Sequence, residues 1–481
     1  MPDTLVASRR GEYDAIVVGS GPNGLAAAIE LARAGKSVVV FEAAAEIGGG
    51  TRTAELTVPG FKHDVCSAIH PLVLVSPFFK SLPLHEHGLE MAHPEVPFAH
   101  PLDDGTAAVV EQSIPATVDR LGSDGRAYAR LMGSLVEHHE KIVRQFFGPL
   151  RFPRDPLLFA SFGLKAIQPA RGFIARKFVL PQARALLAGC AAHSMLRLTQ
   201  PTTTGIALLL GSLAHAVGWP AARGGSRAIT DALAGYLLSL GGEIRTDAPV
   251  TDLRELPAAR AVLFDTSPRT MLSVAGERLP RGYVRRAGRF HYGPGVFKVD
   301  WALSEPVPWK AAECGGAGTV HIGGTMDEII ASEDEVTRGK IPDRPFVLLA
   351  QQSVFDDTRA PAGKHTLWGY CHVPNGCTED MTERIEAQIE RFAPGFKDTV
   401  QARNVMSPAD LEAYNSNYVG GDINAGRQDL GQFFTRPTLR FPAYTTPDKG
   451  IYICSASSPP GGGVHGMCGY HAARAALKRS F

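Results

Sequence analysis

The clearest pattern of apolar positions lies near the start of the chain. An apolar run over residues 13–18 is followed by a glycine-rich turn and then by an Ala-rich stretch with helical periodicity. A second apolar run, 37–41, ends at an acidic residue, Glu42. Continuous apolar runs are typical of strands that are buried on both faces, as in parallel sheets. The pattern therefore predicts a strand, a helix and a second, parallel strand.

The turn between these elements has the glycine spacing of a dinucleotide-binding site. Gly19 permits a tight turn, Gly21 lets a pyrophosphate approach the backbone, and Gly24 allows the helix to pack closely on the strand. The helix N-terminus offers unpaired N–H groups to the anion. Glu42 stands about 20 residues further on, where a ribose-binding acid is expected, and it favours a free ribose hydroxyl over a 2′-phosphate. These residues predict bound FAD or NAD, with a purely structural glycine turn as the alternative.

Further along the chain the apolar pattern first favours helices and then strands. Helical periodicity, interrupted by prolines, extends over residues 76–219 and is strongest in 146–180 and 206–215. Another helix is predicted from about 227 to 240, and a last one up to about 478. Strands joined by Gly and Pro turns are expected within 244–250, 261–264, 290–303, 319–324, 345–350, 365–372 and 451–454.

Composition limits the class of protein. The chain has 481 residues, of which 44% are hydrophobic and 20% charged, enough to bury a large core in two or more domains. Its formal net charge of +1 gives no indication of nucleic-acid binding. The seven cysteines are scattered without metal-ligand spacing, which argues against a disulfide framework and a metal site and fits a reducing cytoplasm. Met1–Arg10 lacks the features of a signal peptide, and the longest apolar stretch, 205–219, is too short to span a membrane.

Charge is distributed unevenly along the chain. Between Asp155 and Asp231 there is no acidic residue, while basic side chains alternate with apolar and aromatic ones in the helical segment 141–220. Such a segment suits a membrane interface with anionic headgroups, so we expect a cytoplasmic protein with peripheral contact at the inner face of the membrane. The alternative is a domain surface whose basic residues are solvated. No nucleic-acid partner is expected, because no recognisable motif accompanies the basic residues.

The turn after Glu42 carries the first resemblance to a known family. Gly48-Gly49-Gly50-Thr51-Arg52-Thr53 resembles the turn that contacts the FAD diphosphate in FAD-dependent oxidoreductases of the amine oxidase and phytoene desaturase superfamily. The resemblance implies that Gly49, Gly50, Arg52 and Thr53 lie near the phosphates, a task that suits a guanidinium. The chain departs from the family pattern, in which arginine directly follows the paired glycines, because Gly50 stands there. A solvated loop arginine is the alternative for Arg52.

Two more segments resemble signatures of the same family, in the expected order. Residues 219–226, a helix and residues 241–250 resemble the stretch that returns the chain to the FAD-binding domain, and this implies that the Val250 backbone meets the adenine half of FAD. Residues 450–470 resemble the closing signature, in which a helix N-terminus can stabilise negative charge on a reduced flavin. The residues that this resemblance implies beside the flavin are Gly462, Gly463, Val464 and His465.

The resemblance implies an α/β fold with a discontinuous Rossmann-like FAD-binding domain and a substrate domain of mixed antiparallel sheet and helices. The FAD-binding domain would comprise residues 12–75, 222–275 and 440–481, and the substrate-binding domain residues 76–221 and 276–439. Substrate identity, the electron acceptor and the oligomeric state stay open at this point.

The activity implied by the resemblance is dehydrogenation of a long apolar polyene or isoprenoid by hydride transfer to flavin N5. A hydrophobic small molecule suits the aromatic strands, which lack paired charges. His465 is the predicted catalytic acid or base because of its place beside the flavin, with His321 second. The ketolase-like branch of the family leaves oxygenation, isomerisation and double-bond reduction open. The alternatives are an amine oxidase, with Lys298 as the lysine near N5, and a catalytically silent flavoprotein.

Overall fold

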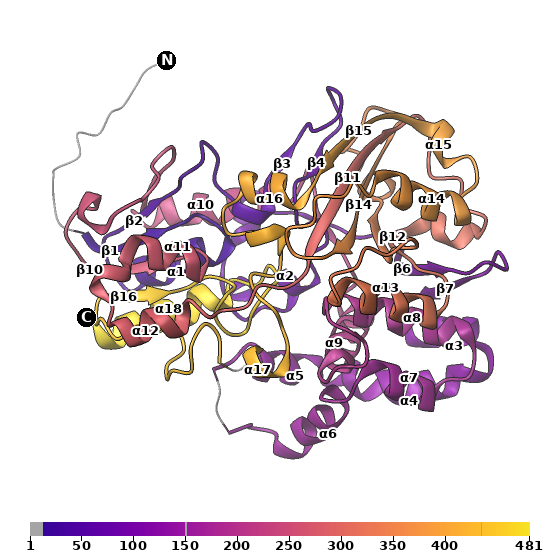
Figure 1. The fold of residues 1–481 in the computed structure, drawn as a ribbon, viewed down its shortest axis with the longest axis horizontal. Helices are drawn as coiled ribbons and strands as arrows, with labels where there is room; N and C mark the ends of the chain where they lie inside the picture. Colours follow the sequence, from indigo (N-terminus) through magenta and orange to yellow (C-terminus); the bar gives the residue numbers. More distant parts are fainter. Residues whose placement is uncertain (1–12, 150–151, 434) are drawn as a thin grey trace.

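A computed structural model describes residues 13–149, 152–433 and 435–481 of the chain. The predicted absence of a signal peptide at Met1–Arg10 therefore lies outside the described residues. Within them the chain forms two large β-sheets, one parallel and one mostly antiparallel, with helices on their faces (Figure 1). The predicted α/β class is confirmed.

The first sheet has five parallel strands, which come from three separate parts of the chain. They are β1 (Tyr13–Val18), β2 (Val38–Phe41), β9 (Glu243–Arg245), β10 (Ala259–Phe264) and β16 (Ile451–Ile453), in the spatial order β16-β10-β1-β2-β9. Ile16 and Val17 of the central strand are fully buried, as predicted for an apolar run covered on both faces. The discontinuous Rossmann-like sheet is therefore confirmed, while the predicted domain boundaries stay predictions.

Helices cover both faces of this sheet. The helices on one face are α1 (Pro22–Arg33), α10 (Arg227–Ser239) and α18 (Met467–Arg479), and those on the other are α11 (Pro268–Ala275) and α12 (Arg281–Ala287). α1 and α18 pack so closely that a side chain at Gly469 would overlap the carbonyl of Asn23. This contact ties the C-terminal helix to the first helix of the chain.

The second sheet has seven strands. They are β6 (Val96–Pro101), β7 (Ala107–Val110), β11 (Gly295–Leu303), β12 (Ala317–Ile322), β13 (Val347–Ala350), β14 (His365–Val373) and β15 (Val400–Met406), in the order β15-β11-β14-β13-β12-β6-β7. All neighbours are antiparallel except β6 and β12. The strands predicted between 290 and 372 are confirmed. The helical prediction for 76–219 is wrong at β6 and β7, because every residue of β6 is buried and its sequence lacks the polar alternation of a half-exposed strand.

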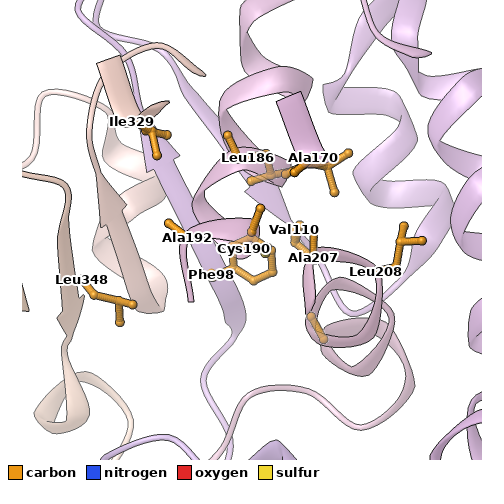
Figure 2. Close-up of a cluster of buried hydrophobic side chains, with 14 of the residues drawn as sticks. Phe98, Val110, Ala170, Leu186, Cys190, Ala192, Ala207, Leu208, Ile329 and Leu348 are labelled. Atoms are coloured by element: carbon orange, nitrogen blue, oxygen red, sulfur yellow. The ribbon is translucent and has the colours of Figure 1, made fainter. Parts of the chain in front are cut away.

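The helical segment lies against one face of the second sheet. Figure 2 shows this contact, in which Phe98 and Leu348 from the sheet face Leu186 and Cys190 of α8 (Pro181–Ala192) and Ile329 of α13 (Met326–Thr337). The other face is covered by α14 (Thr382–Phe392) and α15 (Phe396–Thr399). The remaining helices of this half are α3 (Ile114–Arg120), α4 (Gly125–Glu137), α5 (His139–Phe146), α6 (Pro156–Ala166), α7 (Ala170–Lys177), α9 (Thr203–Ala216), α16 (Pro408–Tyr414) and α17 (Leu430–Phe433).

Short elements complete the fold. They are α2 (Pro71–Val75) and two short antiparallel pairs, β3 (Thr53–Ala54) with β4 (His63–Asp64) and, from distant parts of the chain, β5 (Met91–Ala92) with β8 (Ala221–Ala222). Among the helices in the described part of the chain, none is both long and apolar enough to cross a bilayer.

A buried ion network joins the two halves of the molecule. Arg359 has no exposed surface and donates to Asp64 (2.9 Å), to Asp356 (2.8 Å) and to the carbonyl of Ala222 (3.0 Å). Burial alone would raise the pKa of Asp64, but the Arg359 guanidinium and hydrogen bonds from neighbouring residues hold it below its ordinary value. Ala222 of β8 packs in the core of the parallel sheet, whereas Asp64 belongs to β4, which contacts β14, and Asp356 and Arg359 lie between β13 and β14. The network therefore fixes the position of one sheet relative to the other.

Candidate functional site

A cavity of about 780 Å³ extends from the parallel sheet to the antiparallel sheet. At one end, here called the nucleotide end, the glycine-rich turn and the ends of parallel strands form the wall through residues 18–23, 41–44, 248–250 and 265–267. At the other, here called the sheet end, the wall consists of His193, Leu210, Trp219, Thr319, Leu348, Trp368 and Tyr370. Further wall segments are 49–52, 66–72, 413–418, 455–457 and 462–464.

The glycine-rich turn has the backbone shape that the sequence predicts. Gly19 lies in the left-handed region at φ +102°, and a side chain on Gly24 would overlap the carbonyl of Gly19. α1 therefore begins in close contact with the end of β1. Gly21 is the N-cap of α1 and lines the cavity together with Gly19. The turn thus presents a backbone cradle for an anion.

Glu42 is held in a fixed orientation after β2. Its Oε2 accepts hydrogen bonds from the backbone N–H (3.0 Å) and the hydroxyl (2.6 Å) of Ser20, and its Oε1 accepts from the N–H of Ala44 (3.0 Å) and from Arg52 (3.2 Å). The side chain is mostly buried and lines the cavity. Glu42 therefore stands where a ribose-binding acid is predicted, and its role in binding stays a prediction.

The chain departs from the family pattern at Gly50 for a steric reason. A Cβ on Gly50 would collide with the hydroxyl of Tyr418, which also lines the cavity. Gly49 has a positive φ of +52°, and its Cβ would lie 3.2 Å from the Cα of Gly21. Both glycines line the cavity and the turn lies against Gly21, while their contact with the FAD phosphates stays a prediction.

The structure separates the two other predicted phosphate neighbours. Arg52 lines the cavity, donates to Glu42 and lies 5.3 Å from the centre of the Tyr414 ring. Its side chain is buried, so the solvated-loop alternative is wrong for Arg52. Thr53 is not among the cavity-lining residues, because its hydroxyl donates to Asp64 (2.8 Å) in the β3–β4 hairpin. Thr53 therefore supports the hairpin instead of facing a phosphate.

Asp265 is a candidate that the sequence analysis missed. It directly follows β10, its Oδ2 accepts a hydrogen bond from the N–H of Gly24 (2.8 Å), and a Cβ on Gly21 would lie 2.7 Å from that oxygen. Burial raises the pKa of Asp265 well above its ordinary value, and the negative charge of Glu42 raises it further. The position of Asp265 at the carboxyl end of a strand beside β1 was the signal that could have identified it.

The remaining predicted FAD contacts lie on the cavity wall. They are Val250, Gly462, Gly463 and Val464, which come from two segments more than 200 residues apart in the chain. The fold thus brings the separate signatures to one cavity, and their contacts with a cofactor stay predictions.

His465, the predicted catalytic residue, is not among the cavity-lining residues. Its Nδ1 accepts from the N–H of Met467 (3.0 Å), so its Nε2 carries the proton and donates to the carbonyl of Gly461 (3.1 Å). The ring is 1% exposed and packs on Phe147, and burial lowers its pKa to about 4. Both ring nitrogens shape the loop before α18, so the geometry gives His465 a structural role and does not support the predicted acid or base role.

His321, the second predicted catalyst, reaches the cavity only through another histidine. It is fully buried on β12, and its Nε2 lies 2.9 Å from Nε2 of His193. Burial, reinforced by His193 and His100, lowers the pKa of His321 well below its ordinary value. His193 follows α8 and lines the sheet end of the cavity. The sequence analysis missed His193, because a single histidine after an Ala-rich helix carries no recognisable pattern.

Lys298, the lysine considered for an amine oxidase, is buried on β11 and forms an ion pair with Asp300. Its ammonium lies 6.0 Å from the centre of the Trp368 ring, and it is not among the residues that line the cavity. Within the described ranges, no group of three or more His, Cys, Asp or Glu side chains is placed to hold a metal ion.

Comparison with known proteins supports the fold. Residues 17–81 match the family model of the NAD(P)-binding Rossmann-like domain. Over 96% of its length the chain is 28% identical to a pyridine nucleotide-disulfide oxidoreductase domain-containing protein 2 from Rattus norvegicus, covering 93% of that protein. It is 23% identical to a neurosporene-forming phytoene desaturase from Rhodobacter capsulatus, over 95% of this chain and 92% of the relative.

Two solved structures share the whole architecture. An oxidoreductase from Methanosarcina mazei superposes with a TM-score of 0.65 at 16% identity, over 97% of this chain and all of that one. Wild-type putrescine oxidase bound to putrescine gives a TM-score of 0.63 at 20% identity, over 98% of this chain and all of that one. The chain therefore has the fold of these oxidases, built on a Rossmann-like dinucleotide-binding domain.

Proposed function

We propose that this protein is an FAD-dependent oxidoreductase that dehydrogenates a long apolar polyene or isoprenoid. The proposal rests on one observation: a continuous cavity joins a turn of the dinucleotide-binding type to an apolar, aromatic sheet wall. Ligand sites of this kind are mostly apolar, with a small number of placed polar groups. The full-length likenesses to named oxidoreductases support the same class of activity.

The residues at the nucleotide end fit FAD. At Gly21 the backbone is open to a ligand, and a side chain there would collide with Asp265. Glu42 is already oriented by its hydrogen bonds with Ser20 and Arg52. In this proposal the α1 N-terminus binds the pyrophosphate, Glu42 binds the ribose and the Val250 backbone meets the adenine. Gly462, Gly463 and Val464 would lie beside the flavin ring. Bound FAD would supply hydride acceptance at N5.

The sheet end would hold the apolar substrate and exclude water. Trp219, Leu348, Trp368 and Tyr370 form its wall, and no Lys, Arg, Asp or Glu of the described chain lines this end. Apolar burial of this kind binds a substrate without a charged anchor. The arrangement suits a neutral, largely apolar substrate better than the cationic amine of an amine oxidase, and Lys298, the lysine considered for that alternative, is held in an ion pair with Asp300.

Anaerobic absorbance of the flavin tests the proposal. The FAD-loaded protein is mixed with liposomes that carry phytoene or other polyenes and, separately, with putrescine and cyclohexylamine. Bleaching of the oxidised flavin band by polyenes alone is the expected result. Bleaching by the amines alone would replace it with the amine oxidase alternative, and failure of every reductant would favour the catalytically silent flavoprotein.

We also propose peripheral contact with an anionic membrane at the inner face, through the helical segment 141–220. Leu157 and Leu164 of α6 are 86% and 71% exposed, and Val179 is 74% exposed, close to the basic residues Lys165 and Lys177. Exposed apolar and basic groups together favour an anionic lipid surface.

Liposome flotation with and without anionic lipid tests this contact. We expect flotation only with anionic lipid, and its loss in a Leu157→Asp/Leu164→Asp variant. Leu238→Asp is the matched control, because Leu238 is also exposed (55%) but lies on α10, beside the parallel sheet. Recovery of the wild type in the soluble fraction both with and without anionic lipid would contradict the proposed membrane contact.

A further inference from the structure

The sheet end of the cavity contains polar groups that have no protein partner. The hydroxyl of Thr319 and the indole N–H of Trp368 are buried and form no hydrogen bond with any described residue, and both side chains line the cavity. Buried polar groups are almost always paired, so two orphans on one wall indicate a missing acceptor. They are 1% and 5% exposed, respectively.

These two groups lie on the same face of the sheet. Thr319 of β12 is paired with Ala350 of β13, and Ala350 is paired with Trp368 of β14. Residues directly opposite each other on neighbouring strands project to the same face. Only the small side chain of Ala350 stands between them in the register, and the side chains of Thr319 and Trp368 on either side of it line the same cavity.

His193 contributes a third polar group, whose proton can be placed by elimination. The 2.9 Å contact between its Nε2 and Nε2 of His321 requires that one ring donates and the other accepts. Nδ1 of His321 is buried without a partner and faces Gly189, where a Cβ would lie 2.7 Å from it. An orphaned buried N–H is rarer and costlier than an orphaned lone pair. The proton of His321 therefore sits on Nε2 and is donated to His193.

This assignment leaves the proton of His193 on Nδ1. No described residue accepts a hydrogen bond from that nitrogen, and the side chain is partly exposed to the cavity. Burial lowers the pKa of His193 to about 3, with His372 contributing, so the ring is neutral. The sheet end thus offers neutral donors from His193, Thr319 and Trp368 and no described Lys or Arg.

We propose that the sheet end binds a neutral carbonyl or hydroxyl oxygen of an otherwise apolar, elongated substrate, with His193 as the donor. This inference rests on the proposed function for the nature of the reaction, but it names a feature of the substrate that a plain hydrocarbon lacks. Thr319 and Trp368 flank the oxygen. His321 is a positioning residue, because its hydrogen bond keeps the proton of His193 on the nitrogen that faces the cavity.

Binding of three matched isoprenoids tests the proposal without any turnover. The FAD-loaded full chain is titrated with farnesal, farnesene and farnesoic acid, which share one carbon skeleton. Tryptophan fluorescence reports binding at the sheet end, because Trp219 and Trp368 line it and Trp219 packs on His193 (5.7 Å between ring centres). We expect farnesal to bind about tenfold more tightly than farnesene, the gain from one satisfied hydrogen bond, and farnesoic acid to show no such gain.

Two variants remove donors while keeping shape. His193→Phe should abolish the preference for farnesal and leave the affinity for farnesene unchanged, which also shows that the variant is folded. Thr319→Val should reduce the preference severalfold. Thr366→Val is its matched control, because the Thr366 hydroxyl is likewise buried and unpartnered but does not line the cavity.

The carbonyl stretching frequency of bound farnesal separates a positioning role of His321 from a structural one. Infrared difference spectra should show a lowered frequency in the wild type and a free carbonyl in His193→Phe. His321→Phe should weaken the shift, while His321→Gln, whose amide can still donate to His193, should keep it. A shift that is unchanged in His321→Phe would assign that residue to structure alone.

Two results would overturn the inference: equal binding of farnesal and farnesene by the wild type, or a preference that persists in His193→Phe. Tightest binding of farnesoic acid would also overturn it, since a carboxylate site would then be present. The proposed function fails separately, through an inability to bind FAD or a flavin that no polyene reduces, because the preference is read from affinity alone.

Discussion

The two ends of the cavity differ in whether the protein supplies hydrogen-bond partners for their polar groups. At the nucleotide end, the carboxyl groups already accept hydrogen bonds from the protein. Glu42 accepts from Ser20, Ala44 and Arg52, and Asp265 accepts from Gly24. At the sheet end, Thr319 and Trp368 have no partner among the described residues. The first end is therefore preorganised by the protein itself. The second would gain its hydrogen bonds from a ligand, and such a site favours a ligand that carries the matching atom.

The largest expected effect comes from breaking the buried ion network that joins the two halves of the molecule. Arg359→Met leaves Asp64 and Asp356 buried without a counter-charge and should reduce the free energy of unfolding by about 3–5 kcal/mol. Urea denaturation followed by circular dichroism measures the loss. Arg254→Met, which removes an exposed ion pair with Asp252, is the control and should change stability far less, because solvent screens an exposed pair. Similar losses in the two variants would contradict the assigned role of the buried network.

Removing the preorganised acid should weaken the nucleotide end alone. Glu42→Ala deprives Arg52 and Ser20 of their partner and should raise the dissociation constant for FAD about 10- to 100-fold, as expected for loss of a hydrogen bond to a charged group. Quenching of flavin fluorescence on binding provides the measurement. Glu46→Ala serves as the control, because Glu46 is exposed and pairs with Arg227 outside the cavity wall. A matching loss of affinity in the control would mean that the whole turn, and not Glu42, determines binding.

A smaller effect is expected at His465. His465→Ala loses the hydrogen bonds with Met467 and Gly461 and should cost about 1–2 kcal/mol of folding stability. Its pKa of about 4 places its titration below the neutral range, so the pH profile of flavin reduction by substrate between pH 5 and 8 should keep its shape. Rapid-mixing absorbance at several pH values is the measurement. Loss of one limb of that pH profile in the variant would instead support the predicted role of His465 as a catalytic acid or base.

The smallest change should come from Asp265→Asn, because asparagine keeps the hydrogen bond from Gly24 and matches the carboxyl group in shape. Burial raises the pKa of Asp265, so the folded wild type binds a proton more tightly than the unfolded chain does. The free energy of unfolding of the wild type should therefore fall relative to the variant as the pH rises from the ordinary value of 3.8 through the raised one. Thermal denaturation across this pH range measures the difference. Parallel stability curves for the two proteins would show that Asp265 is ionised in the folded state.

The first elements of the fold were predictable because local patterns define them. The apolar run of β1, the spacing of Gly19, Gly21 and Gly24, and the acid after β2 all lie within one stretch of sequence. The joining of β9, β10 and β16 to the same sheet could be expected only from family resemblance, because no periodicity records a pairing between distant strands. The β6–β7 hairpin was missed because full burial removes the alternation that marks a strand.

The histidines show where prediction from sequence ended. His465 lies in a recognisable glycine-rich segment, yet backbone groups of Met467 and Gly461 occupy both of its nitrogens. His193 lies in no motif, yet the fold brings it to the cavity and to His321 from 128 residues away. Hydrogen-bond partners decide whether a histidine is available, and these partners are set by tertiary structure.

The dispersed parallel sheet has a consequence for synthesis of the protein. β1, α1 and β2 are synthesised more than two hundred residues before β10, and β16 and α18 follow later still. Until then, the apolar face of α1 that α18 covers has no permanent partner. Pairings between distant segments form slowly and leave apolar surface exposed to aggregation. We therefore expect α1 to need shielding until α18 has been synthesised.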